Sequence, residues 1–97
     1  MTPERTQAYG RVLHTLEELG PSKLQPVEQE RIRYAADSLI FCADLHEDEA
    51  ARESLEDTEL LCELLVESGR WERVTAERLI EDIRACGPAL PAELQAV

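Results

Sequence analysis

The hydrophobic positions along the chain recur three and four residues apart, which is the period of an amphipathic α-helix. Four such segments follow one another, separated by short stretches that contain Gly, Pro or clustered charge. Sustained two-residue alternation and Asn-Gly or Asp-Gly hairpin signals, which would predict strands, do not occur in the sequence. The pattern therefore predicts an all-α protein, a small antiparallel bundle of about four helices joined by short loops.

The first two helices have recognisable ends in the sequence. Thr2 can cap the first helix, and Gly20-Pro21 ends it, because glycine adopts the left-handed cap conformation and proline cannot continue the helical hydrogen bonds. Pro26 suits the first position of the second helix. No Gly or Pro ends that helix, so we expect a turn at 44–48, where like charges would repel one another on a helix. The alternative is a single bent helix that continues through 44–48.

The third and fourth helices also end at glycines. The third is expected to end at 68–69, and its second half is apolar on nearly all sides, which favours burial on several sides. Thr75 is the expected cap of the fourth helix, and Gly-Pro at 87–88 is its expected end. The whole chain, 1–97, is expected to form one domain, in which the tail 89–97 either packs as a short turn or frays.

The negative charge of the chain is concentrated in one segment. The 97 residues carry a net charge of −11, and 44–63 alone holds nine carboxylates and Arg52, a net charge of −8. This charge argues against direct binding to nucleic acid and to anionic membrane surfaces, because both attract clustered Lys and Arg. It favours solubility, and it favours basic protein partners through electrostatic steering.

The densest apolar run in the chain, 60–66, overlaps the end of this acidic segment. Trp71, the single tryptophan, follows it in a predicted connection. Trp71 can either fold back to close the end of the bundle or anchor a partner, because tryptophan is enriched among interface hot spots. The predicted partner-binding residues therefore combine acidic and apolar side chains: Asp48, Glu49, Glu53, Glu56, Asp57, Glu59, Leu60, Leu61, Leu64 and Trp71.

No constellation of catalytic residues can be identified in the sequence. Cys42 and His46 are four residues apart, a spacing that can direct two ligands to one metal, but zinc needs at least three protein ligands. Cys62, Cys86 and His14 have no partner at short spacing. The acidic segment lacks the alternating acids and the glycine of a calcium-binding EF-hand loop. We therefore expect cysteines that behave as small hydrophobic residues, no enzyme activity, no metal and no cofactor.

The cysteines also bear on the compartment. Three cysteines are an odd number, and they are spread too widely to suggest a disulfide framework. The N-terminal residues include no apolar signal region, and no apolar run approaches the roughly 20 residues of a membrane span. We expect a cytoplasmic protein with reduced thiols.

Two functions fit this sequence best, and a small enzyme or metal-binding protein is a third alternative, which metal analysis of the purified protein would identify. The first is a small non-enzymatic interaction module that docks the acidic face of its third helix on a basic surface of a protein partner, as a regulator or inhibitor. Such a module can also imitate the charge of a nucleic acid. The second is a homodimeric structural bundle whose apolar third helix forms a two-fold interface. Salt-sensitive binding to a partner would indicate the first function, and a dimer without any partner would indicate the second.

Overall fold

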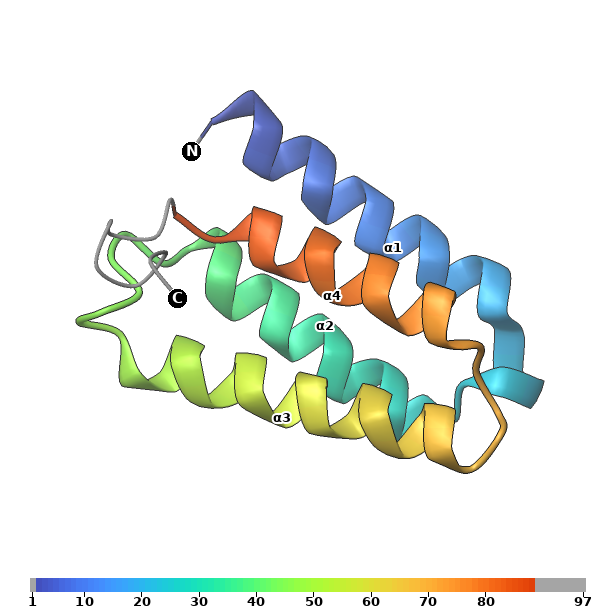
Figure 1. Ribbon diagram of the computed structural model, residues 1–97. Coiled ribbons are helices and arrows are strands. Elements are labelled where there is room, and N and C mark those ends of the chain that lie inside the picture. Colours follow the sequence, from blue (N-terminus) through green and yellow to red (C-terminus); the bar gives the residue numbers. More distant parts are fainter. Residues whose placement is uncertain (1, 89–97) are drawn as a thin grey trace.

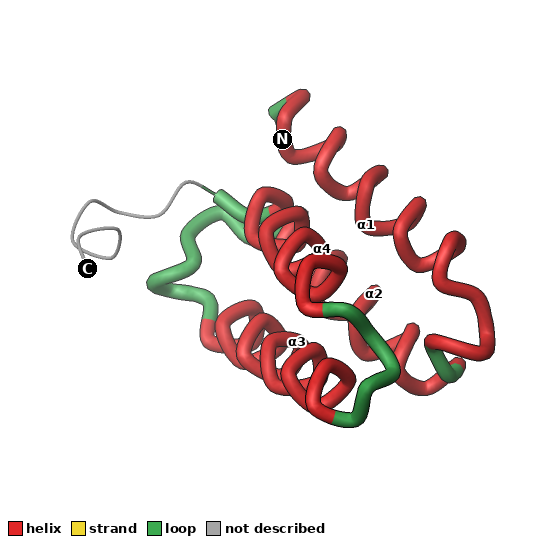
Figure 2. Tube along the Cα trace, turned by 45° about the vertical axis from the view of Figure 1, so that its right-hand side comes forward, coloured by secondary structure: helices red, strands yellow, loops and turns green. Residues whose placement is uncertain are grey.

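Four helices run up and down in an antiparallel bundle in the computed structural model, which describes residues 2–88 (Figure 1). Helix α1 spans Pro3–Lys23, α2 spans Pro26–Ile40, α3 spans Glu49–Glu67 and α4 spans Arg73–Cys86. No strand is present between residues 2 and 88, so the predicted all-α bundle is confirmed. Helix α1 packs mainly against α4, and α2 packs mainly against α3, which gives two layers of two helices (Figure 2).

Most helix ends lie where the sequence predicts them. The Thr2 hydroxyl accepts a hydrogen bond from the Arg5 backbone N–H at 3.3 Å and caps α1. Gly20, with φ 69°, interrupts the helical backbone, and one further turn follows before the connection to α2. Gly69, with φ 80°, gives α3 a left-handed end in which the Leu65 carbonyl accepts hydrogen bonds from the N–H groups beyond the helix.

Two helix ends differ in detail from the prediction. Helix α4 begins directly after Glu72, so Thr75 lies inside its first turn and does not cap it. The Thr75 N–H donates instead to the Glu72 carbonyl at 3.1 Å. Residues 41–48 separate α2 from α3, a longer break than the predicted turn, and no continuous bent helix forms. The expectation for the tail 89–97 concerns residues outside those that the structure describes.

The core contains most of the predicted apolar stripes. Its largest side chains with less than 2% exposure are Ile32, Leu39, Leu65, Leu79, Ile83, Val12, Thr58 and Cys86. The second half of α3 does not follow the prediction of burial on several sides, because Leu60 is 59% exposed and Leu64 is 52% exposed. Helix α3 has neighbours on its inner side alone, so apolar residues on its outer side remain in contact with water.

Trp71 closes the end of the bundle at which α1 connects to α2 and α3 connects to α4. Its side chain is 4% exposed, and its Nε1 donates to the Lys23 carbonyl at 2.8 Å. Beside it, the Arg70 guanidinium donates to both carboxylate oxygens of Glu28, at 2.6 and 3.2 Å, and the Gln25 N–H donates to Glu28 at 2.9 Å. Of the two roles that the sequence allowed for Trp71, the structure therefore shows the first, in which Trp71 closes the end of the bundle.

Arg5, in the first turn of α1, holds the opposite end of the bundle. Its guanidinium donates to four carbonyl oxygens at 2.7–3.1 Å, those of Leu39, Ile40, Cys42 and Cys86. Carbonyls at the C-terminal end of a helix have no donor within the helix and carry the negative end of its dipole. Arg5 therefore ties the start of α1 to the ends of α2 and α4.

We predict that Arg5→Met lowers the free energy of unfolding by about 3 kcal/mol, because several carbonyls lose a charged donor at once. Arg5→Lys should recover part of this loss, since lysine keeps the charge but lacks the planar fork. Urea unfolding followed by circular dichroism measures both changes. Arg11→Met is the control, because Arg11 is half-exposed and pairs with Asp82 at the surface. Equal losses for Arg5→Met and Arg11→Met would contradict the prediction.

We also predict a pH-dependent contribution from Glu28. Hydrogen bonding from Arg70 lowers the pKa of Glu28, although burial opposes this effect. Because the folded pKa lies below the unfolded one, the stabilisation is present above the unfolded pKa and is lost as pH falls through the folded pKa. Glu28→Gln should therefore be destabilised by about 1–2 kcal/mol at neutral pH, and the difference from wild type should shrink in acid.

A series of urea unfolding curves from neutral to acidic pH measures the contribution of Glu28. Glu67→Gln is the control, because Glu67 is exposed on α3 and forms no ion pair among residues 2–88. Its effect should stay small at every pH. A loss in Glu28→Gln that does not vary with pH would show that the charge of Glu28 contributes nothing.

Candidate functional site

The outer face of α3 carries the acidic surface that the sequence predicts. Asp48 caps this helix, and its carboxylate accepts a hydrogen bond from the Ala51 N–H at 3.0 Å. Beyond the cap, exposed carboxylates recur three, four or seven residues apart, so they share the side of α3 that faces away from the core. We call these residues the α3 acidic stripe: Glu49, Glu53, Glu56, Glu63 and Glu67.

Two of the predicted acidic residues lie beside this stripe and hold α3 to its neighbours. Asp57 accepts hydrogen bonds from Arg31 of α2 at 2.7 and 3.0 Å, and this contact lowers the pKa of Asp57 against a smaller opposing effect of burial. Glu59 forms an ion pair with Arg84 of α4. These carboxylates therefore have partners within the bundle and fix the position of α3.

The first half of the stripe has no such partners. Glu49, Glu53 and Glu56 are exposed and form no ion pair among residues 2–88. Like charges three and four residues apart repel each other by a few tenths of a kcal/mol per pair. Together with Glu67, which is also exposed and forms no ion pair among residues 2–88, these three carboxylates are therefore the acidic groups of α3 that are most available to a cation from outside.

The four predicted apolar anchors divide into two groups. Leu60 and Leu64 are more than half exposed and lie beside the stripe. Leu61 and Trp71 are each 4% exposed and belong to the core, so a partner cannot contact them while the fold is intact. The structure thus corrects the predicted set: Leu61 lies three residues after the fully buried Thr58, on the inner face of α3.

Three exposed apolar residues of the α2 region were not among the predicted site residues. Val27 and Tyr34 lie on α2 and are 60% and 61% exposed. Phe41 is the first residue after α2 and is 80% exposed. The signal that could have found them is their spacing, since residues seven apart share a helical face and none of the three shares the face of Ile32.

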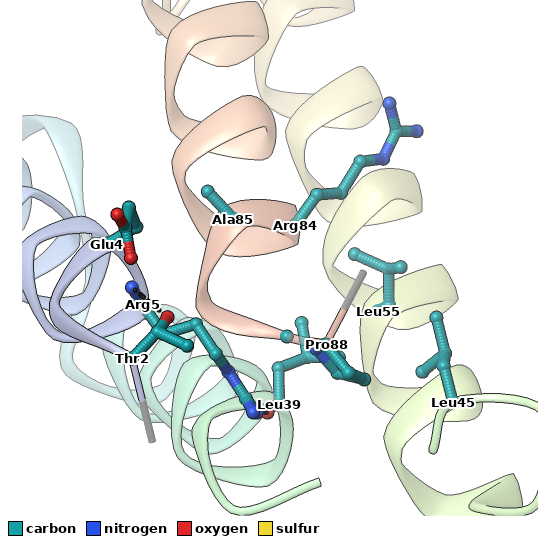
Figure 3. Close-up of a pocket in the computed structure, with 10 residues that line it drawn as sticks. Thr2, Glu4, Arg5, Leu39, Leu45, Leu55, Arg84, Ala85 and Pro88 are labelled. Carbon is teal, nitrogen blue, oxygen red and sulfur yellow. Dashed lines mark hydrogen bonds between the residues drawn. The ribbon is translucent and has the colours of Figure 1, made fainter. Parts of the chain in front are cut away.

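A pocket of about 650 Å³ lies at the end of the bundle that Arg5 holds (Figure 3). Its walls come from all four helices and from the loop before α3: Thr2, Glu4, Arg5, Leu39, Leu45, Leu55, Arg84, Ala85, Gly87 and Pro88. Both of its arginines are already engaged, Arg5 with backbone carbonyls and Arg84 with Glu59. The pocket therefore offers apolar contacts and few free polar groups.

The cysteines and histidines do not assemble into a site between residues 2 and 88. No group of three or more potential metal ligands lies together there. Cys42 is buried and His46 is exposed, so the two side chains do not share one environment. Burial raises the pKa of Cys62 to about 12 and that of Cys86 to about 11, and it is also the main cause of the raised pKa of Cys42. Thiols with such pKa values are poor nucleophiles, because the thiolate is the reactive form.

Comparison with protein-family models, with curated proteins and with solved structures finds no match to this chain. Among the helices of residues 2–88, none has both the length and the apolar character needed to cross a bilayer. The features of this protein that bear on function are therefore the exposed surfaces of α2 and α3.

We predict that the three free cysteines react slowly with iodoacetamide in the folded protein at mildly alkaline pH and rapidly after unfolding in guanidinium chloride. Mass spectrometry of the alkylated protein measures the extent of reaction. Ser22→Cys provides the matched control, because Ser22 is exposed and a thiol there should react in the folded state. Rapid, stoichiometric alkylation of a wild-type cysteine in the folded protein would show that a thiolate is accessible.

Proposed function

We propose that this protein is a small non-enzymatic interaction module that binds a basic surface of a protein partner through the outer face of α3. It acts as a regulator or inhibitor of that partner. The observation that carries the proposal is the row of exposed carboxylates at Glu49, Glu53 and Glu56, which have no ion-pair partner among residues 2–88. A cationic partner would relieve the repulsion within this row.

Binding would proceed in two physical steps. The negative field of α3 attracts the basic surface and raises the association rate, an effect that salt screens. Leu60 and Leu64 then bury apolar area, and burying an exposed leucine fully is worth about 1.5–3 kcal/mol. The ion pairs of Asp57 and Glu59 support this step, because a surface already fixed in place loses less entropy on binding.

The same geometry supports a form of inhibition. A row of carboxylates on a rigid helix can occupy a groove whose basic side chains otherwise bind nucleic acid phosphates. The protein itself would then bind the partner and not the nucleic acid. The proposal places this module in the cytoplasm and requires no cofactor, in keeping with the free, buried cysteines.

The second candidate function is a homodimeric structural bundle built on α3. Exposed Leu60 and Leu64 favour it. However, a two-fold contact between these leucines would bring two acidic stripes together, and like charges facing each other across an interface cost binding energy. We therefore rank the homodimer below the interaction module.

The experiment compares wild type with a triple variant that carries Glu49→Gln, Glu53→Gln and Glu56→Gln. Each protein serves as bait in a lysate of the source cell, and the captured partner is identified, purified and tested for its association rate at several salt concentrations. We predict that wild type associates at least about 10-fold faster than the triple variant at low salt. The difference should shrink as salt rises.

A matched control removes three carboxylates from the other layer, with Glu17→Gln, Glu77→Gln and Glu81→Gln on α1 and α4. All three residues are exposed and form no ion pair among residues 2–88. This control should behave like wild type. Equal slowing of both triple variants would mean that net charge alone, and not the α3 face, determines binding. Stable dimers of every protein with no captured partner would favour the second function.

A further inference from the structure

An ion pair joins α2 and α3 on the outer side of the bundle, where the two helices lie side by side (Figures 1 and 2). The Arg31 guanidinium donates to both carboxylate oxygens of Asp57, and the two side chains are 39% and 47% exposed. This pair marks the line along which the outer faces of the two helices meet.

Four large apolar side chains lie around this pair. Residues three, four and seven apart share a face of a helix. Val27 and Tyr34 are four residues before and three residues after the arginine of the pair, and Leu60 and Leu64 are three and seven residues after its aspartate. All four are between 52% and 61% exposed. We call this surface the α2–α3 seam, defined by Val27, Tyr34, Leu60 and Leu64 with the Arg31–Asp57 pair.

Exposed apolar residues concentrate on this layer of the bundle. Among residues 2–88, one large exposed hydrophobic side chain, Val74, belongs to α4, and none belongs to α1. The α3 flank of the seam carries the acidic stripe, with Glu53 one turn before the ion pair and Glu63 and Glu67 beside the leucines. An occupant that complements the seam therefore needs a central apolar row and cations along one side.

The backbone of the seam narrows the choice of occupant. The N–H and C=O groups of α2 and α3 are bonded within their own helices, so the seam has no free edge to which an extended strand could add. A helix brings its own backbone hydrogen bonds and can pack on two neighbouring helices by the same ridges and grooves that hold the bundle together. Apolar residues three and four apart along such a helix would follow the seam.

We propose that the α2–α3 seam binds a basic amphipathic helix of the protein partner. The apolar face of that helix lies on Val27, Tyr34, Leu60 and Leu64, and its lysines or arginines lie over the α3 acidic stripe. This inference rests on the proposed function and narrows it, because it adds α2 to the interface and specifies a helical segment as the binding element. A second copy of this chain complements the seam less well, since its own outer face is acidic.

The test uses a labelled peptide of about 18 residues, or five helical turns, made of Leu and Lys with the leucines on one helical face. A second peptide has the same composition in an order that creates no apolar face. Fluorescence anisotropy measures the affinity of each for wild type and for the double variant Val27→Ser, Leu64→Ser. Val74→Ser is the matched control, because Val74 is 64% exposed and lies on α4. Far-ultraviolet circular dichroism checks that each variant is folded.

We expect the amphipathic peptide to bind wild type at least about 10-fold more tightly than it binds the double variant, and more tightly than the reordered peptide binds wild type. Val74→Ser should bind within about twofold of wild type, as expected for a residue outside the interface. Equal affinity of the two peptides, or equal losses in the double variant and in Val74→Ser, would overturn the seam as a helix-binding site. A wild-type dimer that dissociates when Leu64 is replaced would also overturn it, by assigning the seam to a second copy.

The seam and the proposed function can fail separately. Suppose that the triple variant Glu49→Gln, Glu53→Gln, Glu56→Gln no longer binds the partner but the double variant Val27→Ser, Leu64→Ser still does. The seam is then overturned as a binding site, and the acidic face of α3 is retained. If the double variant alone loses binding, the apolar seam is retained and the acidic mechanism is overturned.

Discussion

The carbonyl groups at the C-terminal ends of α2 and α4 meet at one corner of the bundle, and they need a donor that neither helix supplies. Arg5 supplies it from the first turn of a third helix, through a planar group whose N–H bonds diverge toward several acceptors at once. Its bond to the Cys42 carbonyl also fixes the start of the 41–48 connection. Arg52 fixes the other end of this connection through the Leu45 carbonyl at 2.9 Å, so two arginines together position the beginning of α3. The position of the acidic face therefore depends on backbone contacts of one arginine that is distant in sequence, Arg5, and of one within α3 itself, Arg52.

The fold depends on contacts of Arg5 with residues distant in sequence, and this explains which parts of the fold the sequence could predict. The helices and their buried stripes follow from local periodicity. Gly20 and Gly69 mark where the regular helical backbone of α1 and α3 stops, because a left-handed backbone conformation favours glycine. The role of Arg5 has no such local pattern. The one sign of this role in the sequence is the unfavourable position of Arg5, because a cation in the first turn of a helix opposes the helix dipole. A tertiary contact must compensate for this unfavourable interaction. The start of α4 was similarly beyond local reasoning, since Thr75 is a good cap residue that the structure places inside the helix.

The candidate surface could also be predicted only in part, because some of its side chains make contacts with other helices. Helical periodicity places Glu49, Glu53 and Glu56 on one outer face, but it cannot show that Asp57 and Glu59 have partners, because those partners lie on other helices. Adjacent leucines in the second half of α3 gave no periodic signal that separates exposed from buried positions. Tyr34 lies next to the buried Ala35 and Ala36, so its exposure shows only in its seven-residue spacing from Val27, and its place beside α3 is a contact between helices that local periodicity does not give.

The contrast between the two layers gives the strongest argument that the outer face of α3 serves binding. Helices α1 and α4 each carry three acidic and three basic residues, and they use surface pairs such as Arg11–Asp82. Helix α3 carries seven acidic residues and one basic residue, and two leucines on its outer side are more than half exposed. Solubility alone requires neither feature, because the α1–α4 layer meets the same solvent with balanced charge and Val74 as its one large exposed hydrophobic side chain among residues 2–88. Unrelieved repulsion and exposed apolar area both cost stability in a small domain, and the proposed basic, partly apolar partner would recover both costs if it covered this face.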